Sequence, residues 1–299
     1  MPKFSSEDIP DLHGQVILVT GGNAGLGLET IRQLAKHNPA RIYLAARSKA
    51  KAEAAITELQ ESNPSAPISF LQLDLSSFSS VKAAAETFKR SESRLDILIN
   101  NAGIMMMPEG LTESGYEIQF GTNVMGPALF TQLLLPLVQE TAKINPETRI
   151  VSLGSSSEKL APSDIYPFDE LKTTMSHRST ISRYCISKIA DVHYTYALAE
   201  RYKDIKILCV DPGMVSTNLF HNSAGFFLKP FVNMAFGIFS SPVEKGALSQ
   251  IWAAVSPDAK SAEYYSPVGV PGKGSDMSRN RDVQEKLWQW IQNELQGLL

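Results

Sequence analysis

Tyr184 and Lys188 are the two residues whose types and spacing point most directly to proton chemistry. A helical pattern runs from Ile181 to Tyr202, so residues four apart share one face of the expected helix. A tyrosine alone has a pKa of about 10 and is a poor proton donor or base at neutral pH. A neighbouring ammonium favours the phenolate, which makes general acid or base catalysis feasible. Such pairs are common on solvated helices, so the surrounding residues must decide the meaning of this one.

A cluster of glycines between an apolar run and a helical pattern is typical of nucleotide binding. Residues 15–20 are apolar and β-branched, and residues 27–37 repeat apolar side chains at helical spacing. Glycines at such a junction allow a tight turn and let the backbone approach a pyrophosphate at the helix N-terminus. A tight turn alone is the alternative, but the position between strand and helix favours the nucleotide site. The segment contains Gly21, Gly22, Asn23, Ala24, Gly25, Leu26 and Gly27.

The residues after the second apolar run indicate which nucleotide would bind. NAD-binding folds place an acidic residue about 20 residues past the glycines, where it holds the ribose 2′-hydroxyl. Here Arg47 and Lys49 occupy that region, and no carboxylate occurs before Glu53. A guanidinium can bind a 2′-phosphate with paired, charge-assisted hydrogen bonds. We therefore predict NADP(H) over NAD(H); the alternative is that both cations are solvated charges at a helix start.

Apolar runs of strand length alternate with helical patterns along the chain and would position these residues. This alternation predicts a parallel sheet covered by helices on both faces, with ligands outside the carboxyl ends of its strands. We predict an α/β, doubly wound Rossmann fold with a seven-stranded, mostly parallel sheet. Strands are expected at 15–20, 41–45, 68–73, 95–100, 149–153, 205–210 and, at the sheet edge, 263–267. Helices are expected at 27–37, 48–62, 76–89 with Ser76 as the cap, 112–139 and 181–202.

Composition limits the function classes. The chain has 299 residues, with 28 Lys and Arg against 31 Asp and Glu and a net charge of −3. This balance gives no basic footprint for nucleic acid and no polybasic membrane patch. Two cysteines are too few for a disulfide framework, which favours a reducing, cytoplasmic compartment. Acidic residues come early and no long apolar run follows them, so neither a signal peptide nor a spanning helix is expected. The five histidines show no metal-ligand spacing, so no metal is predicted.

A single Rossmann-type domain over residues 1–299 is predicted, because no linker interrupts the alternation between residues 15 and 210. Its core is expected at 14–255, and an amphipathic helix at 282–298 would pack on it or cover a neighbouring subunit. Two insertions, 156–183 and 218–243, are expected to flank a substrate cleft. Six of the 13 phenylalanines fall between positions 220 and 239, which favours an apolar lid over a lipophilic substrate; a buried helix pair is the alternative.

Further motifs follow the ends of the later strands, and together with the glycines they resemble the short-chain dehydrogenase/reductase family over about residues 14–255. The pair Ala46-Arg47, the run Gly103-Ile104-Met105 and the long spacing from serine to tyrosine are most similar to its retinol-dehydrogenase-like branch. The motifs are Thr20-Gly21-x-x-x-Gly25-x-Gly27, Asp74-Leu75, Asn101-Ala102-Gly103, Asn123, Ser155, Tyr184-x-x-x-Lys188 and Pro212-Gly213-x-Val215-x-Thr217.

The resemblance implies roles for a catalytic set. Tyr184 would donate a proton in carbonyl reduction or accept one in alcohol oxidation, and Lys188 would bind the nicotinamide ribose and lower the tyrosine pKa. Ser155, with Ser156 as its competitor, would hydrogen-bond the substrate oxygen. Asn123 would support a water that leads protons to Lys188. The expected cofactor-binding residues are Gly21, Asn23, Gly25, Leu26, Gly27, Arg47, Lys49, Asp74, Leu75, Asn101, Ala102, Gly103, Tyr184, Lys188, Pro212, Gly213, Val215 and Thr217.

The predicted function is hydride transfer between NADP(H) and a carbonyl, or a secondary or primary alcohol, of a lipophilic small molecule, in the direction of reduction. The alternative is a catalytically idle NADP(H)-binding module for sensing or assembly, against which the complete catalytic set counts. The family also implies a homodimer, and residues 191–193 are expected to face solvent or a partner subunit. Peripheral membrane contact has weak support, from Lys229 and Lys245 only.

Overall fold

A seven-stranded sheet forms the centre of the computed structural model, which describes residues 4–213, 215, 241–266, 268–272 and 274–299. The strand order in this part of the chain is β3-β2-β1-β4-β5-β6-β7, and every strand pair is parallel. The order reverses between β1 and β4, where doubly wound sheets open a crevice. The strands are β1 (Val16–Thr20), β2 (Arg41–Ala46), β3 (Ile68–Gln72), β4 (Ile97–Asn100), β5 (Arg149–Leu153), β6 (Lys206–Val210) and β7 (Tyr264–Tyr265).

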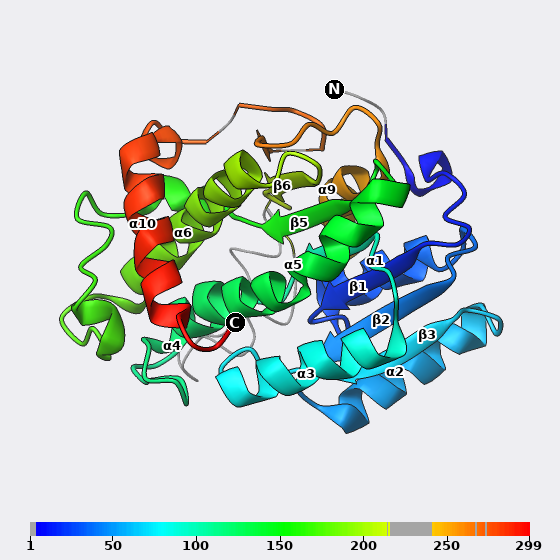
Figure 1. Ribbon diagram of the computed structural model, residues 1–299, viewed down its shortest axis with the longest axis horizontal. Helices are drawn as coiled ribbons and strands as arrows, with labels where there is room; N and C mark the ends of the chain where they lie inside the picture. Colours follow the sequence, from blue (N-terminus) through cyan, green and yellow to red (C-terminus); the bar gives the residue numbers. More distant parts are fainter. Residues whose placement is uncertain (1–3, 214, 216–240, 267, 273) are drawn as a thin grey trace.

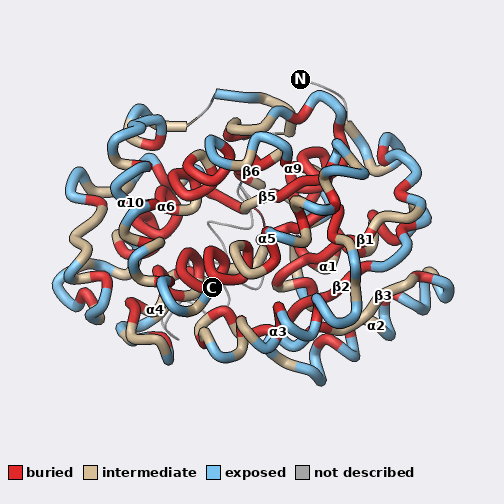
Figure 2. The backbone as a smooth tube through the Cα atoms, in the orientation of Figure 1, coloured by how far each residue is buried: buried red, intermediate tan, exposed pale blue. Residues whose placement is uncertain are grey.

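Helices cover both faces of the sheet, which confirms the predicted fold class (Figure 1). One apolar cluster joins the sheet to α1, α2 and α9, and a second joins its other face to α3, α5 and α6, with α10 outside α6. Figure 2 shows the strands and the inward sides of these helices as the buried part of the molecule. The helices are α1 (Gly25–Leu34), α2 (Lys49–Ser62), α3 (Phe78–Ser91), α4 (Ile118–Phe120), α5 (Gly126–Ile144), α6 (Thr180–Arg201), α9 (Val243–Val255) and α10 (Arg281–Leu295).

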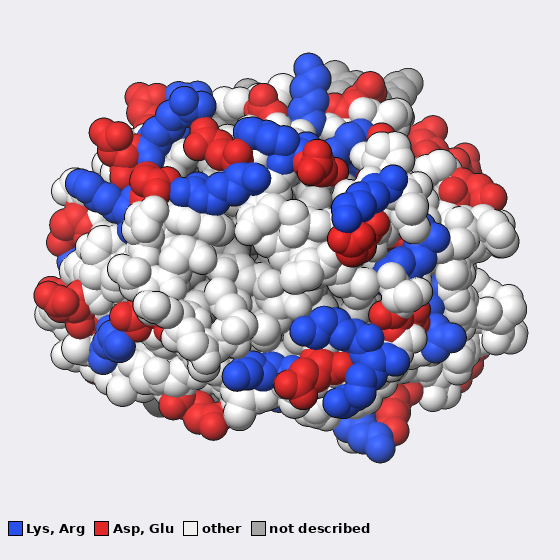
Figure 3. Space-filling view, in the orientation of Figure 1, with Lys and Arg blue, Asp and Glu red and all other residues white. Residues whose placement is uncertain are grey.

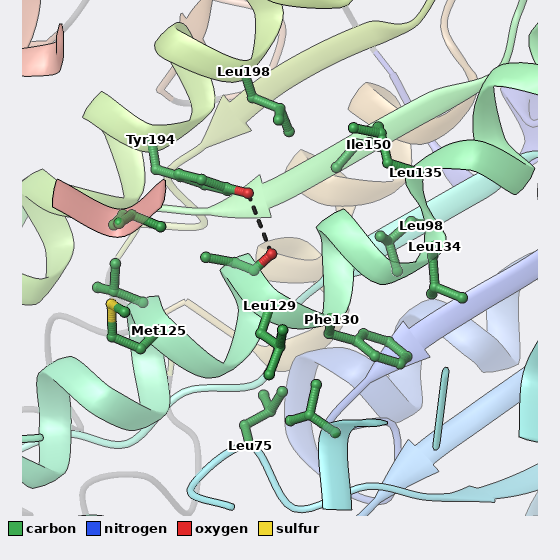
Figure 4. Packing of buried hydrophobic residues seen from close by; sticks show 14 of the residues in the cluster. Leu75, Leu98, Met125, Leu129, Phe130, Leu134, Leu135, Ile150, Tyr194 and Leu198 are labelled. Atoms are coloured by element: carbon green, nitrogen blue, oxygen red, sulfur yellow. Dashed lines mark hydrogen bonds between the residues drawn. The ribbon is translucent and has the colours of Figure 1, made fainter. Parts of the chain in front are cut away.

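The packing of α5 against α6 fixes the helix that carries Tyr184 and Lys188. Leu129, Phe130 and Leu134 of α5 are fully buried, and Tyr194 and Leu198 of α6 lie over the same cluster (Figure 4). The Tyr194 hydroxyl donates a hydrogen bond of 3.3 Å to a backbone carbonyl of α5. Because side chains on both helices interlock over the sheet, the register of α6 relative to β5 is rigidly set.

The helix expected at 112–139 begins only at residue 118, which corrects the prediction. Thr112 and Tyr116 close a turn, in which the Thr112 N–H donates to the Tyr116 carbonyl (2.8 Å) and the Tyr116 N–H donates to the Thr112 hydroxyl (3.2 Å). Glu117 then caps the helix by accepting the N–H groups of Gln119 (2.9 Å) and Phe120 (2.7 Å). A π-helical turn, residues 121–125, connects α4 to α5.

Ser77, rather than the predicted Ser76, caps α3. The Ser77 hydroxyl accepts the N–H of Ser80 (3.3 Å), whereas the Ser76 hydroxyl donates to the Asp74 carboxylate (2.6 Å). Both serines suit a helix start in the sequence. The contact with Asp74 decides between them, because it commits Ser76 to the loop before the helix.

The C-terminal helix α10 packs on its own chain, which is the first of the two alternatives for it. Leu287, Ile291 and Leu295 are fully buried against the core. The Trp290 ring lies 5.3 Å, centroid to centroid, from the stacked ring of Phe168. The apolar stripe read from the sequence therefore faces the domain and covers part of the outer side of α6.

Charged side chains of both signs are mixed around the border of the face in Figure 3, and the middle of that face is uncharged. Within the described ranges, no helix combines the length and the apolar character needed to cross a membrane.

Candidate active site

A cavity of about 390 Å³ opens at the carboxyl ends of the central strands. The loops after β1, β2, β4 and β5 and one side of α6 bound it. It lies where the strand order reverses, which is the ligand position in doubly wound sheets. Most of the predicted cofactor-binding residues line it, namely Gly21, Asn23, Gly25, Leu26, Arg47, Asn101, Ala102, Gly103, Tyr184, Lys188 and Pro212.

The glycine-rich turn brings the backbone of β1 and β4 close to the start of α1. Gly21 has a φ of 66°, in the left-handed region that favours glycine. A Cβ on Gly27 would lie 2.5 Å from the Gly21 carbonyl oxygen and 2.6 Å from Asn101 Nδ2. Asn101 Nδ2 donates to the Thr20 carbonyl (2.7 Å), which ties the end of β4 to the turn. Since the N-cap residue Ala24 has only a methyl group, an anionic ligand can satisfy the first N–H groups of α1.

Arg47 borders the cavity, whereas Lys49 does not. Arg47 follows the last residue of β2 and is exposed at the cavity rim. The Lys49 ammonium is 3.7 Å from the Glu53 carboxylate, and its side chain is 68% exposed. The structure therefore separates the two cations that the sequence presents together.

Asp74 and Leu75 also lie outside the cavity lining. The Asp74 carboxylate accepts the backbone N–H of Ser76 (3.0 Å) in addition to its hydroxyl. Leu75 is buried, and its carbonyl oxygen would lie 2.1 Å from a Cβ on Gly126, at the start of α5. Asp74 thus shapes the loop after β3, and Leu75 forms part of the core beneath α5.

Tyr184 is buried in the cavity wall, and the Ser155 hydroxyl influences the pKa of its phenol. Burial raises the pKa of Tyr184, while the Lys188 ammonium and the Ser155 hydroxyl lower it. The sequence predicts a lowered tyrosine pKa, but removal of the ring from water outweighs the two favourable groups. Ser156 is exposed and begins a short 3₁₀ helix, so the structure brings Ser155 rather than Ser156 to Tyr184.

The Lys188 ammonium is held by two acceptors. Its Nζ donates to the carbonyl of Leu153 at the end of β5 (2.9 Å) and to the carboxylate of Asp191 (2.8 Å). The same Nζ lies 5.9 Å from the centroid of the Tyr184 ring. A buried positive charge therefore stands beside the phenol, in the wall of the cavity.

Asn123 connects the loop after β4 to α6. Its Oδ1 accepts the N–H of Ile104 (2.8 Å), and its Nδ2 donates to the Ile104 carbonyl (2.9 Å) and to the Ser187 hydroxyl (3.0 Å). The Ser187 hydroxyl in turn donates to the Tyr184 carbonyl (2.8 Å). Asn123 lies in the π-helical turn, which is a common feature of functional sites. It positions the cavity wall and does not itself line the cavity.

The segment after β6 is described only in part. The Gly213 N–H donates to the Asp211 carboxylate (2.9 Å). Val215 is buried and forms a parallel bridge with Ser241. Thr217 and the predicted insertion from 218 as far as residue 240, including its phenylalanines, lie outside the described residues.

His193 is buried and the Asp191 side chain is only 11% exposed, which contradicts the expectation that this segment faces solvent or a partner. His193 is fully buried, with Nδ1 2.7 Å from the Tyr166 hydroxyl and Nε2 2.9 Å from the Met277 carbonyl. Burial lowers the pKa of His193 to about 4, so the ring is neutral at pH 7. The insertion and the chain before α10 cover this side of α6. The burial of this segment could not be predicted from residues 191–193, because it depends on those distant parts of the chain.

A buried ion pair between Glu117 and Arg183 lies next to Tyr184. Arg183 Nη1 is 3.1 Å from Glu117 Oε1, and its Nη2 donates to the Met107 carbonyl (3.3 Å). Both charged side chains are almost completely buried. The two residues are 66 positions apart in the chain. No motif in the sequence links an acid and an arginine at that separation, so the pair could not be predicted.

The fold and the site define a Rossmann-type protein with a buried tyrosine–lysine pair beside its ligand cavity. The family model described as short chain dehydrogenase matches residues 15–164. A short-chain dehydrogenase/reductase of Armillaria gallica is 40% identical over 97% of this chain and 93% of its own length. Retinol dehydrogenase 12 of Homo sapiens is 33% identical over 96% of this chain and 88% of its own.

A solved structure of an uncharacterized protein from Mycobacterium paratuberculosis is also similar, with a TM-score of 0.76 and 26% identity over 98% of this chain and 97% of that one. The chain therefore belongs to the short-chain dehydrogenase/reductase family, whose members are NAD(P)-binding oxidoreductases, and it has retinol-dehydrogenase-like relatives.

Proposed function

We propose that this protein transfers a hydride between NADP(H) and the carbonyl or alcohol carbon of a lipophilic small molecule, working mainly as a reductase. The observation that carries the proposal is the position of Tyr184 and Lys188 in the wall of the cavity that the glycine-rich turn forms. A module that only bound a nucleotide would have no use for a buried phenol beside a buried ammonium.

The described residues suit two groups of NADP(H), the pyrophosphate and the 2′-phosphate of the adenosine ribose. The left-handed turn at Gly21 and the N-terminus of α1 suit the pyrophosphate. The exposed guanidinium of Arg47 at the cavity rim suits the 2′-phosphate, and β2 ends at Ala46 without the carboxylate that NAD would require. When bound, the cofactor supplies or accepts the hydride.

The side chains of the site perform the proton transfer. Tyr184, whose pKa burial raises, is protonated at neutral pH and donates this proton to the carbonyl oxygen; the Lys188 ammonium and the Ser155 hydroxyl offset part of the effect of burial. The Lys188 ammonium stabilises the phenolate that remains and, from the same cavity wall, would bind the nicotinamide ribose. Ser155 orients the substrate oxygen, and Asn123 holds the loop after β4 against α6.

An apolar substrate is proposed from the character of the cleft and of one relative. Ile104, in the loop after β4, lines the cavity, and Met105 beside it is buried. Six phenylalanines occur between positions 220 and 239 in the sequence. The relative named retinol dehydrogenase acts, by its name, on retinol, which is an apolar alcohol.

Turnover of defined carbonyl compounds tests the proposal. The purified protein is incubated with NADPH and all-trans-retinal, decanal or glyoxylate, and the loss of NADPH absorbance is followed. We expect faster turnover of retinal and decanal than of the small polar glyoxylate. Tight NADPH binding without turnover of any carbonyl would instead support the idle nucleotide-binding module.

Replacement of Arg47 by Asp is expected to change the cofactor preference from NADPH to NADH. Loss of the charge-assisted contacts to the 2′-phosphate should raise the KM for NADPH by about 10- to 100-fold. Steady-state kinetics with both cofactors measure the change. Lys49→Asp, which removes the neighbouring cation outside the cavity, should change the preference much less. Equal effects of both substitutions would contradict the assignment to Arg47.

Replacement of Gly27 by Ala is expected to weaken both cofactor binding and stability. The new methyl group would meet the Gly21 carbonyl at 2.5 Å, so the turn must shift at a cost of about 1–3 kcal/mol. NADPH affinity by fluorescence and urea unfolding measure the two effects. Gly110→Ala is the matched control, because its Cβ would meet only Ile118 at an ordinary 3.9 Å.

The single-domain organisation over 1–299, the homodimer, peripheral membrane contact and a cytoplasmic location remain predictions from the sequence. For the homodimer, α10 already covers part of the outer side of α6, one of the two helices through which the family associates.

A further inference from the structure

Asp191 is a buried carboxylate one helical turn after Lys188. Its Oδ2 is 2.8 Å from Lys188 Nζ, and the two side chains are only 11% and 8% exposed. Among the described residues, Lys188 is the only cation in contact with this carboxylate. The Leu153 carbonyl is the other acceptor of the ammonium, at 2.9 Å. The lysine is therefore held between a strand end that borders the main cavity and a carboxylate that does not line it.

A second, small cavity lies beside Asp191. It has a volume of about 20 Å³, which is enough for one water molecule, and it is lined by Asp191, Asn100, Asn123 and Ser152 among others. Asn100 Oδ1 has no hydrogen-bond partner in the part of the chain that the structure describes. The carboxylate thus has a polar setting on its second side, supplied by β4, β5 and the π-helical turn.

Several titratable groups face Asp191 from the elements around it. Lys188 and Tyr184 lie on α6 itself, Tyr166 reaches it from the insertion, and Cys209 reaches it from β6. Only Lys188 is cationic, so Asp191 and Lys188 form a compact pair of opposite charges next to the phenol. Such a pair has a weaker field at Tyr184 than an isolated ammonium would have.

The pKa directions agree with this geometry. Burial by itself would lower the pKa of Lys188, but Asp191, together with Tyr184 and Cys209, outweighs that effect, and the pKa of Lys188 is raised. Burial raises the pKa of Asp191 to about 6 despite the ammonium beside it, so the carboxylate is ionised at neutral pH and above. At Tyr184, Lys188 lowers the pKa and Asp191 raises it.

We propose that Asp191 is a positioning residue that holds the Lys188 ammonium against the Leu153 carbonyl and, through its charge, keeps Tyr184 protonated for carbonyl reduction. The role in carbonyl reduction rests on the proposed function, whereas the effect of Asp191 on the ionisation of Tyr184 is a property of the protein itself. A catalytic lysine without this carboxylate would favour the phenolate more strongly, and hence alcohol oxidation.

The titration of Tyr184 tests the proposal without any cofactor or substrate. The protein is labelled with ¹³Cζ-tyrosine, and the Tyr184 resonance, assigned by its absence in Tyr184→Phe, is followed against pH. Asp191→Asn keeps the shape of the side chain and removes the charge, so Tyr184 should ionise at a pH lower by about one unit. Asp204→Asn removes the same charge at an exposed position after α6 and should leave the titration unchanged.

The outcomes are distinct. A downward shift in Asp191→Asn alone supports the role, and an unchanged Tyr184 titration overturns it. Asp191→Ser, which leaves room for a water, is measured in the same way should the asparagine variant not fold. Loss of folding in both variants would assign Asp191 a purely structural role and also overturn the proposal.

Activity forms the second arm, with NADPH and all-trans-retinal as the probe. Reduction by Asp191→Asn should decline at a lower pH than in the parent protein, because the donor phenol is lost earlier, and retinol oxidation should begin at a lower pH. A shifted titration in a protein that turns over no carbonyl would overturn the proposed function and leave the electrostatic role of Asp191 standing. If the protein reduces retinal but the Tyr184 titration does not shift in Asp191→Asn, the proposed function stands and the role of Asp191 is overturned.

Discussion

Replacing Tyr184 with Phe is expected to lower kcat for NADPH-dependent carbonyl reduction by about 10²- to 10⁴-fold, the usual contribution of a positioned acid. The substitution removes only the hydroxyl, and the buried ring stays in the cavity wall, so the fold and the cavity should persist. The affinity for NADPH should therefore stay near that of the parent protein. Steady-state kinetics and a fluorescence titration with NADPH measure the two quantities separately.

Tyr202→Phe is the matched control, because it removes a phenol at the opposite end of α6 and should retain full activity. A kcat for Tyr184→Phe close to that of the parent would exclude Tyr184 as the proton donor. Loss of NADPH affinity together with activity would instead indicate that the hydroxyl supports the cofactor site.

Replacing Arg183 with Met is expected to destabilise the protein by about 3–5 kcal/mol, because it leaves the Glu117 carboxylate buried without its counter-charge. Among the described residues, Glu117 would retain the N–H groups of residues 119 and 120 and the Gln119 side chain, all of them uncharged partners. The carbonyl of Met107 would also lose a donor, in a loop that follows the cavity wall. Urea unfolding measures the free energy, and a fall in kcat is expected because Arg183 immediately precedes Tyr184.

The double variant Glu117→Leu with Arg183→Met removes both charges and should be more stable than the single variant, since the cost comes from the unpaired charge. Lys143→Met breaks an exposed pair with Glu140, whose side chains are both 67% exposed, and should cost less than about 1 kcal/mol. If Arg183→Met lowers the free energy of unfolding no more than Lys143→Met does, the buried ion pair does not stabilise the fold.

Much of the fold could be predicted because strands buried on both faces are nearly continuous apolar runs. The sequence predicts β5 at 149–153, and the strand occupies those residues, as Arg149–Leu153. The helix predicted at 181–202 lies at Thr180–Arg201. The delayed helix start near residue 118 could not be predicted, because the Thr112 side chain stabilises a turn before it and Glu117, rather than an earlier residue, caps the helix.

The site divides in the same way. The sequence by itself determined that Tyr184 and Lys188 share a helix face and that the glycine-rich turn joins a strand to a helix, because both relations depend on residues close together in the chain. The tertiary structure alone decided that Ser155 rather than Ser156 reaches the phenol, and that Arg47 rather than Lys49 borders the cavity.

Tertiary structure also turned Asp191 inward, against the expectation that it faces solvent. Its three-residue spacing from Lys188 is visible in the sequence, but such a pair is equally common on exposed helices. Whether two charges on a helix are solvated or enclosed depends on the segments that cover them. Here the end of β5 binds Lys188, and the residues around Asp191 come from β4, β5 and the π-helical turn, far away in sequence. Local spacing thus determined which groups can interact, and long-range packing decided how strongly they do.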